Sequence, residues 1–211
     1  MRLPFTKMHG AGNDYIYVDA FAYDLKDPAE FALHMSDRHK GIGSDGLVLI
    51  GPSKTCDVRM RMFNADGSEG RMCGNASRCV GKYAYEHGIC RKESMTMETL
   101  AGVKVLHLTT ENDVVTSVTV DMGQPLLHPA DIPMAVQGDS FIDGEIECAG
   151  RTWRGTAVCT GPAHLVIFTD IPVDELDFPV IGPQFENHPL FPDRVNTDFV
   201  NEIGNGVFQT R

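Results

Sequence analysis

Hydrophobic and polar residues alternate at every second position in some stretches of the chain, whereas in others apolar residues recur at every third or fourth position. From residue 56 to residue 63 apolar and basic side chains alternate, which predicts a half-buried strand that ends at Asn64. After Cys73 the apolar spacing becomes helical, so we expect a helix that begins at Cys73 and closes at Gly88. Further strands are expected within 5–19 (two, around a turn at 10–13), at 47–50, 95–100, 103–109 and 114–122, with a helix from Pro28 to near Asp37.

The pattern breaks at Gly123-Gln124-Pro125, which predicts two domains, 1–122 and 123–211. In the second domain we expect strands near 153–159 and 165–169 and a short helix around 183–187. Residues 10–19 align weakly with residues 161–170, with three identities and a shared apolar pattern at an offset of 151 residues. This alignment suggests an internal repeat.

Composition excludes several classes of protein. A net charge of −11 and a pI near 5.1 argue against a nucleic-acid or anionic-membrane partner. The N-terminus lacks a signal-peptide pattern and no apolar run approaches 18 residues, so a cytoplasmic protein is expected. The six cysteines show no CxxC pair and no His cluster at zinc spacing, so we expect neither a disulfide framework nor a metal site.

The position of Cys73 at a helix start gives this thiol a chemical possibility. Unpaired N–H groups and the positive end of the helix dipole favour a thiolate and bind carboxylates. A thiol beside a bound carboxylate can exchange the proton on the adjacent carbon. The alternative is a small apolar residue that caps a core helix; the glycines and asparagines around Cys73 favour the functional interpretation.

Four segments, in order along nearly the whole chain, carry a family resemblance. They are KMHGAGNDYIYVD (7–19), IGSDGLVLI (42–50), NADGSE with MCGN (64–69 and 72–75) and IGPQFENHPLFPDRVNTDFV (181–200). Together they resemble diaminopimelate epimerase, a cofactor-independent amino-acid isomerase. The resemblance implies an α+β fold of two similar domains that face each other across a cleft, each with a mixed sheet wrapped round a central helix.

The resemblance also implies a function. It is the interconversion of LL- and meso-diaminopimelate, in lysine and cell-wall precursor biosynthesis, by two opposed thiols without a cofactor. Cys73 is the implied catalytic residue, and the implied substrate contacts are Asn13, Asn64, Gly74, Asn75 and Asn196. The expected partner is a small amino-acid substrate, with no nucleic acid and no membrane; a homodimer is left open.

The chain departs from the family pattern at two places. Some family members carry Gln where this chain has Gly46, and Pro162 stands where the family commonly has Asn. His164 is retained, as a structural or a catalytic residue. The segment from Gly41 to Gly46 matches GxGxxG, but a helix precedes it and a strand follows it, the reverse of a dinucleotide site.

The repeat predicts where the second thiol should lie. The 151-residue offset moves Cys73 to about position 224, beyond Arg211, so the second domain is expected to be incomplete and residues 1–211 alone inactive as an epimerase. Two alternatives remain open: a racemase of another amino acid on the same fold, and a non-catalytic fragment that binds carboxylates.

Overall fold

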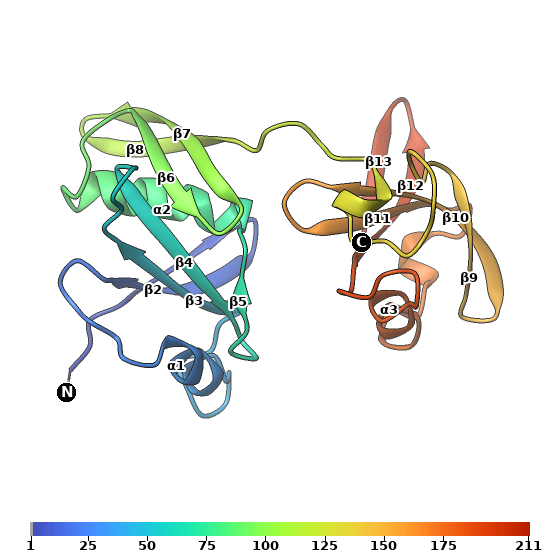
Figure 1. The fold of residues 1–211 in the computed structure, drawn as a ribbon, viewed down its shortest axis with the longest axis horizontal. Helices are drawn as coiled ribbons and strands as arrows, with labels where there is room; N and C mark the ends of the chain where they lie inside the picture. Colours follow the sequence, from blue (N-terminus) through green and yellow to red (C-terminus); the bar gives the residue numbers. More distant parts are fainter. Residues whose placement is uncertain (1) are drawn as a thin grey trace. The chain divides into compact units, whose positions relative to one another are not determined.

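The chain forms two compact units in a computed structural model that describes residues 2–211. Unit 1 is Met1–Met122 and unit 2 is Gly123–Arg211. Figure 1 colours them from blue to green and from yellow to red, respectively. Each unit has its own hydrophobic core, and each is described by itself.

Unit 1 is built on an eight-stranded mixed sheet in the order β1-β2-β3-β4-β6-β7-β8, with β5 paired to β4. The pairs β2/β3 and β4/β6 are parallel and the others antiparallel. The elements are β1 (Thr6–Gly10), β2 (Asn13–Asp19), α1 (Pro28–Met35), β3 (Gly46–Gly51), β4 (Val58–Asn64), β5 (Glu69–Gly70), α2 (Gly74–Glu86), β6 (Ser94–Thr99), β7 (Gly102–Glu111) and β8 (Val114–Asp121).

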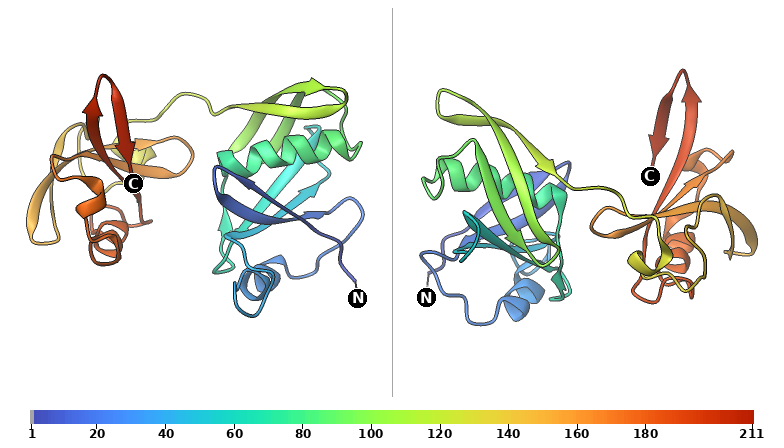
Figure 2. Two further views of the ribbon diagram at one scale, coloured as in Figure 1. Left: turned by 180° about the vertical axis from the view of Figure 1, so that it is seen from behind. Right: turned by 45° about the horizontal axis from the view of Figure 1, so that its top comes forward.

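Helix α2 forms the centre of unit 1. It contacts strands from both ends of the sheet, including β1, β2, β7 and β8, because the sheet curls around it (Figures 1 and 2). Ala76, Val80 and Ala84 on this helix are fully buried. They pack with inward-facing residues such as Tyr17, Val48 and Met60.

Helix α1 packs on the other face of the sheet. Asp27 caps it by accepting a hydrogen bond from the Glu30 N–H at 3.0 Å, and Pro28 occupies the first turn. Ala32 of α1 is buried against Ile16 and Leu47, which alternate along their strands with the inward-facing residues. Strands β2 and β3 are therefore covered on both faces, which explains their continuous apolar sequence.

Unit 2 contains a five-stranded sheet in the order β13-β12-β11-β10-β9, with β11 and β12 parallel and the other pairs antiparallel. Its elements are η1 (Pro129–Asp131), β9 (Gly144–Cys148), β10 (Arg151–Cys159), β11 (Ala163–Phe168), η2 (Val173–Glu175), α3 (Phe178–Glu186), β12 (Asn196–Gly204) and β13 (Val207–Thr210). Trp153, Phe185 and Phe199 meet edge to face in its core. No helix formed by the described residues is long and apolar enough to cross a lipid bilayer.

The two units repeat one strand–helix–strand arrangement. In each, an antiparallel pair is followed by a short helix and a parallel strand: β1-β2-α1-β3 in unit 1 and β10-β11-α3-β12 in unit 2. The starts of β2 and β11, of α1 and α3, and of β3 and β12 are each 150 residues apart. Ile16 and Ile167, identical in the sequence alignment, both belong to the clusters that contain the short helix.

The units differ on the opposite face of the sheet. In unit 1 that face is covered by α2. In unit 2 the described residues place no helix there, and Phe168 and Phe208 meet edge to face while 64% and 51% exposed. The sheet wrapped round a central helix is thus present in unit 1.

Most predicted elements are confirmed. Strand β5 in unit 1 and strand β12 in unit 2 were not predicted, and two further differences lie in unit 2. Helix α3 begins at Phe178, five residues before the predicted start at Pro183. The prediction was too short because two prolines occur within the helix and obscure the helical pattern of the sequence. Strand β9 was not predicted. Only Ile146 and Cys148 of its five residues are buried, so its apolar alternation is short.

Gly46, the first residue of β3, is required by close backbone packing. It pairs with Tyr15 on one side and with Asn64 on the other. A Cβ atom at this position would lie 2.0 Å from the Phe63 carbonyl oxygen, and the backbone has φ of +157°. A Gln at this position, as the family resemblance suggests for other members, therefore does not fit this backbone without a shift.

We expect Gly46→Ala to destabilise unit 1 by more than about 2 kcal/mol, because strand β3 must move away from β4. Gly102→Ala is the matched control: its φ is +93°, but a Cβ there meets nothing within 4 Å, so only backbone strain of about 1 kcal/mol is expected. Urea unfolding of both variants measures the difference. Equal losses would show that the β3–β4 contact relaxes freely.

Candidate active site

Cys73 is the N-cap residue of α2. Its backbone is extended, with φ −139° and ψ 117°, and its Sγ accepts a hydrogen bond from the Ala76 N–H at 3.5 Å. The Ser77 N–H and hydroxyl both donate to the Cys73 carbonyl, at 2.9 and 2.8 Å. The thiol is therefore fixed at the helix start in the position that Ser, Thr or Asp commonly takes.

The first turn of α2 offers N–H groups to an anion. The N–H groups of Gly74 and Asn75 have no acceptor within the helix, as expected at a helix N-terminus. The first turn contains no acidic residue. The positive end of the dipole is therefore not neutralised from within the helix, and a bound carboxylate is favoured there.

Asn13 and Tyr15 approach the same thiol from β2. The two residues share the face of β2 that packs on α2, because side chains alternate along a strand. Asn13 Nδ2 donates to Cys73 Sγ at 3.6 Å. Asn13 thus lies beside Cys73, and its role as a substrate contact stays a prediction.

Tyr15 is a site residue that the sequence did not reveal. Burial raises the pKa of its phenol well above its usual value, and the adjacent Cys73 thiol adds to the rise, so Tyr15 stays protonated. Tyr15 lies on the same strand as Asn13, whose side chain contacts the Cys73 thiol. The sequence signal that could have indicated Tyr15 is its position two residues after Asn13, which places both side chains on the same face of the strand.

Asn64 lies at the end of β4 on the side that faces α2, in the alternation of Met60 and Met62. It pairs across the sheet with Gly46, which pairs with Tyr15. Its Nδ2 donates to the Ser68 hydroxyl at 2.9 Å, and its N–H to the Ser68 carbonyl at 2.8 Å. Asn64 thus holds its own turn, in addition to lining the side of the sheet that carries Tyr15.

Comparisons with known proteins identify the family of this chain. The sequence profile named diaminopimelate epimerase matches residues 5–127. Proteins named diaminopimelate epimerase from Desulfovibrio desulfuricans and Phocaeicola vulgatus are both 54% identical to this chain. The matches cover 99% and 94% of this chain, and 75% and 70% of those proteins, respectively.

The chain belongs to the diaminopimelate epimerase family. It is accordingly an isomerase, of the amino-acid epimerase type. Among solved structures, a hydroxyproline epimerase from Agrobacterium vitis has a TM-score of 0.67 over 98% of this chain and 68% of its own, at 16% identity. That likeness confirms the fold, a mixed-sheet α+β architecture.

Two residues singled out by the family resemblance lie in unit 2. Asn196 opens β12, and its Nδ2 donates to the Ala163 carbonyl at 3.2 Å. His164, paired in register with Asn196, bonds through Nδ1 to Asp198 Oδ2 at 2.8 Å. His164 is therefore oriented by a carboxylate, as His residues with either a structural or a chemical role commonly are.

The other cysteines of this family member differ from Cys73 in position. All six are free. Cys79 and Cys148 are buried, and burial raises the pKa of the Cys148 thiol. Cys56 lies before the start of β4, whereas Asn64 is at the end of that strand. Cys90 lies after the end of α2, whereas Cys73 is at the start of that helix. Within residues 2–211 no group of three or more His, Cys, Asp or Glu is arranged to hold a metal.

A charged network ties together the two turns that flank the site. Arg38 Nη2 bonds to Asp14 Oδ1 at 2.6 Å and to Asp45 Oδ1 at 2.9 Å, and Lys7 Nζ lies 3.0 Å from Asp14 Oδ2. The Asp14 N–H donates to Asp45 Oδ2 at 2.9 Å, and the Asp45 N–H donates to the Asp14 carbonyl at 2.7 Å. The Arg38 guanidinium, followed by Lys7, holds the pKa of the Asp14 carboxyl well below its ordinary 3.8, although partial burial opposes the shift.

This network should make unit 1 sensitive to acid. Because the folded-state pKa of Asp14 is lowered, its contribution to stability is present above pH 4 or so and is lost as the pH falls below that value. Asp14→Asn should lower the urea midpoint at pH 7 and reduce the further loss on acidification to pH 3. Asp24→Asn, in an exposed pair with Lys26, is the control and should change little. Equal acid sensitivity in wild type and Asp14→Asn would contradict the assignment.

Proposed function

We propose that this family member interconverts LL- and meso-diaminopimelate and that Cys73 is one of two opposed thiols that exchange the α-proton. One observation carries the proposal: the Cys73 thiol caps α2 beside the Asn13 amide, directly next to the N–H groups of Gly74 and Asn75. Base and carboxylate site are thus adjacent. Relatives that carry the name diaminopimelate epimerase at 54% identity support the choice of substrate.

The chemistry follows from this adjacency. The substrate carboxylate accepts hydrogen bonds from the first turn of α2, and the Cys73 thiolate removes the α-proton. The electron pair left on carbon moves into the carboxylate, where the helix N-terminus stabilises the added charge. A second thiol on the opposite face returns a proton and inverts the centre; in the reverse reaction the two thiols exchange roles.

Asparagine side chains hold the rest of the substrate in this proposal. Asn13 and Asn64 belong to the side of the sheet that faces α2 and supply amide donors and acceptors. Asn196 is assigned to the same substrate by family resemblance. A neutral amide suits an amino acid that carries both ammonium and carboxylate groups, because it can donate to one and accept from the other.

The substrate assignment predicts ligand protection of a single cysteine. With limiting iodoacetamide, Cys73 should be alkylated, and LL- or meso-diaminopimelate should slow its alkylation, because the bound carboxylate covers the helix N-terminus. Cys56 and Cys90 are internal controls whose labelling should not respond to ligand. Mass spectrometry of the digested protein reads all three. If proline or glutamate protected Cys73 and diaminopimelate did not, the substrate would be another amino acid.

The role of Cys73 predicts the origin of isotope exchange. In heavy water, any deuterium that enters the α-carbon of LL-diaminopimelate should require Cys73 and disappear in Cys73→Ala. Mass spectrometry measures deuterium, and chiral chromatography measures meso product in the same samples. A single base gives exchange with retention, whereas two opposed groups give inversion. Undiminished exchange in purified Cys73→Ala protein would remove Cys73 from the mechanism.

A further inference from the structure

Arg78 reaches back along α2 to its first turn. Its Nη2 donates to Asn75 Oδ1 at 2.6 Å and its Nη1 to the Gly74 carbonyl at 3.4 Å. Helical side chains tilt towards the N-terminus, so a residue four positions after Gly74 can make both contacts. Arg78 thereby touches the two residues that offer N–H groups next to Cys73.

The charge of Arg78 is unusual for its location. A cation near a helix N-terminus is unfavourable because the helix dipole is positive at that end. No carboxylate of residues 2–211 forms an ion pair with Arg78, whose hydrogen-bond acceptors are a neutral amide and a carbonyl. An uncompensated guanidinium thus reinforces the positive potential of the first turn.

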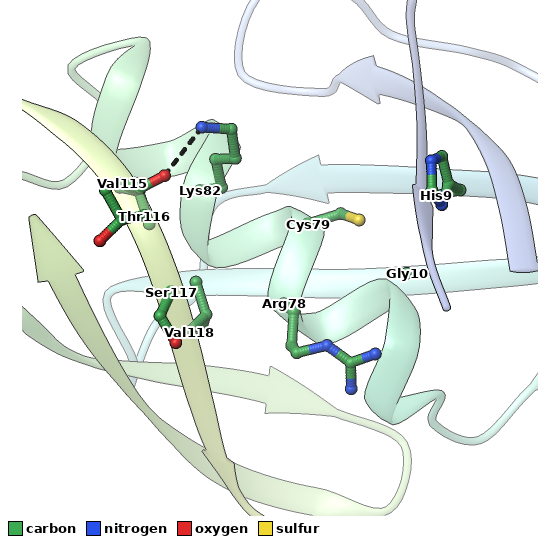
Figure 3. A pocket seen from close by; sticks show the side chains of 9 residues that line it. All are labelled: His9, Gly10, Arg78, Cys79, Lys82, Val115, Thr116, Ser117 and Val118. Carbon is green, nitrogen blue, oxygen red and sulfur yellow. Dashed lines mark hydrogen bonds between the residues drawn. The ribbon is translucent and has the colours of Figure 1, made fainter. Parts of the chain in front are cut away.

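Lys82, one turn further along the helix, provides the contrast. Both side chains line the pocket of about 310 Å³ between β1, α2 and β8 (Figure 3). Lys82 Nζ, however, bonds to Glu86 Oε1 at 2.6 Å and to the Val115 carbonyl at 3.0 Å. Its charge is neutralised by a carboxylate, and its contacts lie away from the first turn.

The Arg78 contact also decides what Asn75 can offer to a ligand. Its amide oxygen is occupied by the guanidinium, so the amide nitrogen, a donor of two hydrogens, is the free group. The backbone of Asn75 is confined as well, since a Cβ on Gly10 would lie 2.7 Å from the Asn75 carbonyl oxygen. Arg78 thus orients the Asn75 amide through its oxygen, and the amide nitrogen can donate to a carboxylate.

We propose that Arg78 is a positioning residue that orients the Asn75 side chain for the substrate carboxylate. The inference rests on the proposed function of the Cys73 site. It assigns to Arg78 an indirect role, exerted through Asn75, and predicts that the two residues act as one unit in carboxylate binding.

A double-mutant cycle on Asn75 and Arg78 tests the proposal. The measured quantity is the concentration of LL-diaminopimelate that halves the alkylation rate of Cys73, which does not depend on the intrinsic reactivity of the thiol. Asn75→Ala should raise it about tenfold and Arg78→Gln about five- to tenfold, as expected for hydrogen bonds to a charged group. The double variant should resemble Asn75→Ala alone.

Two further variants separate charge from geometry. Arg78→Lys keeps the charge but lacks the planar fork, so it should recover only part of the loss. Lys82→Gln removes one charge from the same pocket. The concentration of LL-diaminopimelate that halves the alkylation rate of Cys73 should then stay within about twofold of the wild-type value. Thermal unfolding of every variant shows whether the fold is retained.

The outcomes are distinct. If diaminopimelate fails to protect Cys73 in the wild type, the proposed function is wrong. If it protects, and Asn75→Ala weakens protection while Arg78→Gln has no effect or adds fully to Asn75→Ala, the positioning role of Arg78 is wrong. An Arg78→Gln variant that melts earlier but protects normally would show a structural role only, and would also overturn the proposal.

Discussion

The packing of α2 inside the curled sheet of unit 1 is the contact on which the rest of the structure depends. Three alanine and valine side chains of this helix are fully buried, so its axis and its N-terminus cannot shift without opening the core. Cys73 is held in place by the same packing because it is the N-cap residue of this helix. A reactive group fixed by a core helix needs no separate loop to hold it in place.

The apolar pattern predicted most strands, the two helices of unit 1 and the start of α2 at Cys73. These predictions succeeded because α2 and β4 each bury one face against a core and expose the other, so their periodicity is visible in the sequence. Helix α3 was predicted too short because Pro183 lies inside it and disrupts the expected pattern. Strand β9 has too few buried positions to give a signal.

The residues around the thiol were predicted less completely, because their roles arise from contacts across the sheet. Asn13 was assigned by family resemblance, and its bond to Cys73 spans 60 positions of sequence. The sequence showed Tyr15 only as an alternating strand residue. Its place beside Cys73 depends on how β2 lies against α2, and periodicity does not contain that information. The requirement for glycine at position 46 likewise comes from the Phe63 carbonyl on the neighbouring strand.

Charge is distributed unevenly between the two faces of β2, and this division bears on the proposed carboxylate site. On the outer side, Asp14 pairs with Lys7 and Arg38, and Asp45 pairs with Arg38, so the two turns are held together by opposite charges. On the inner side, the first turn of α2 carries no acid, and Arg78 near it has no carboxylate partner among the described residues. Although the chain as a whole has a net charge of −11, the helix dipole and the Arg78 guanidinium both contribute positive potential near Cys73. A carboxylate that enters this site replaces water with donors already held in place, which is the condition under which hydrogen bonds contribute most to binding and to the stabilisation of developing charge.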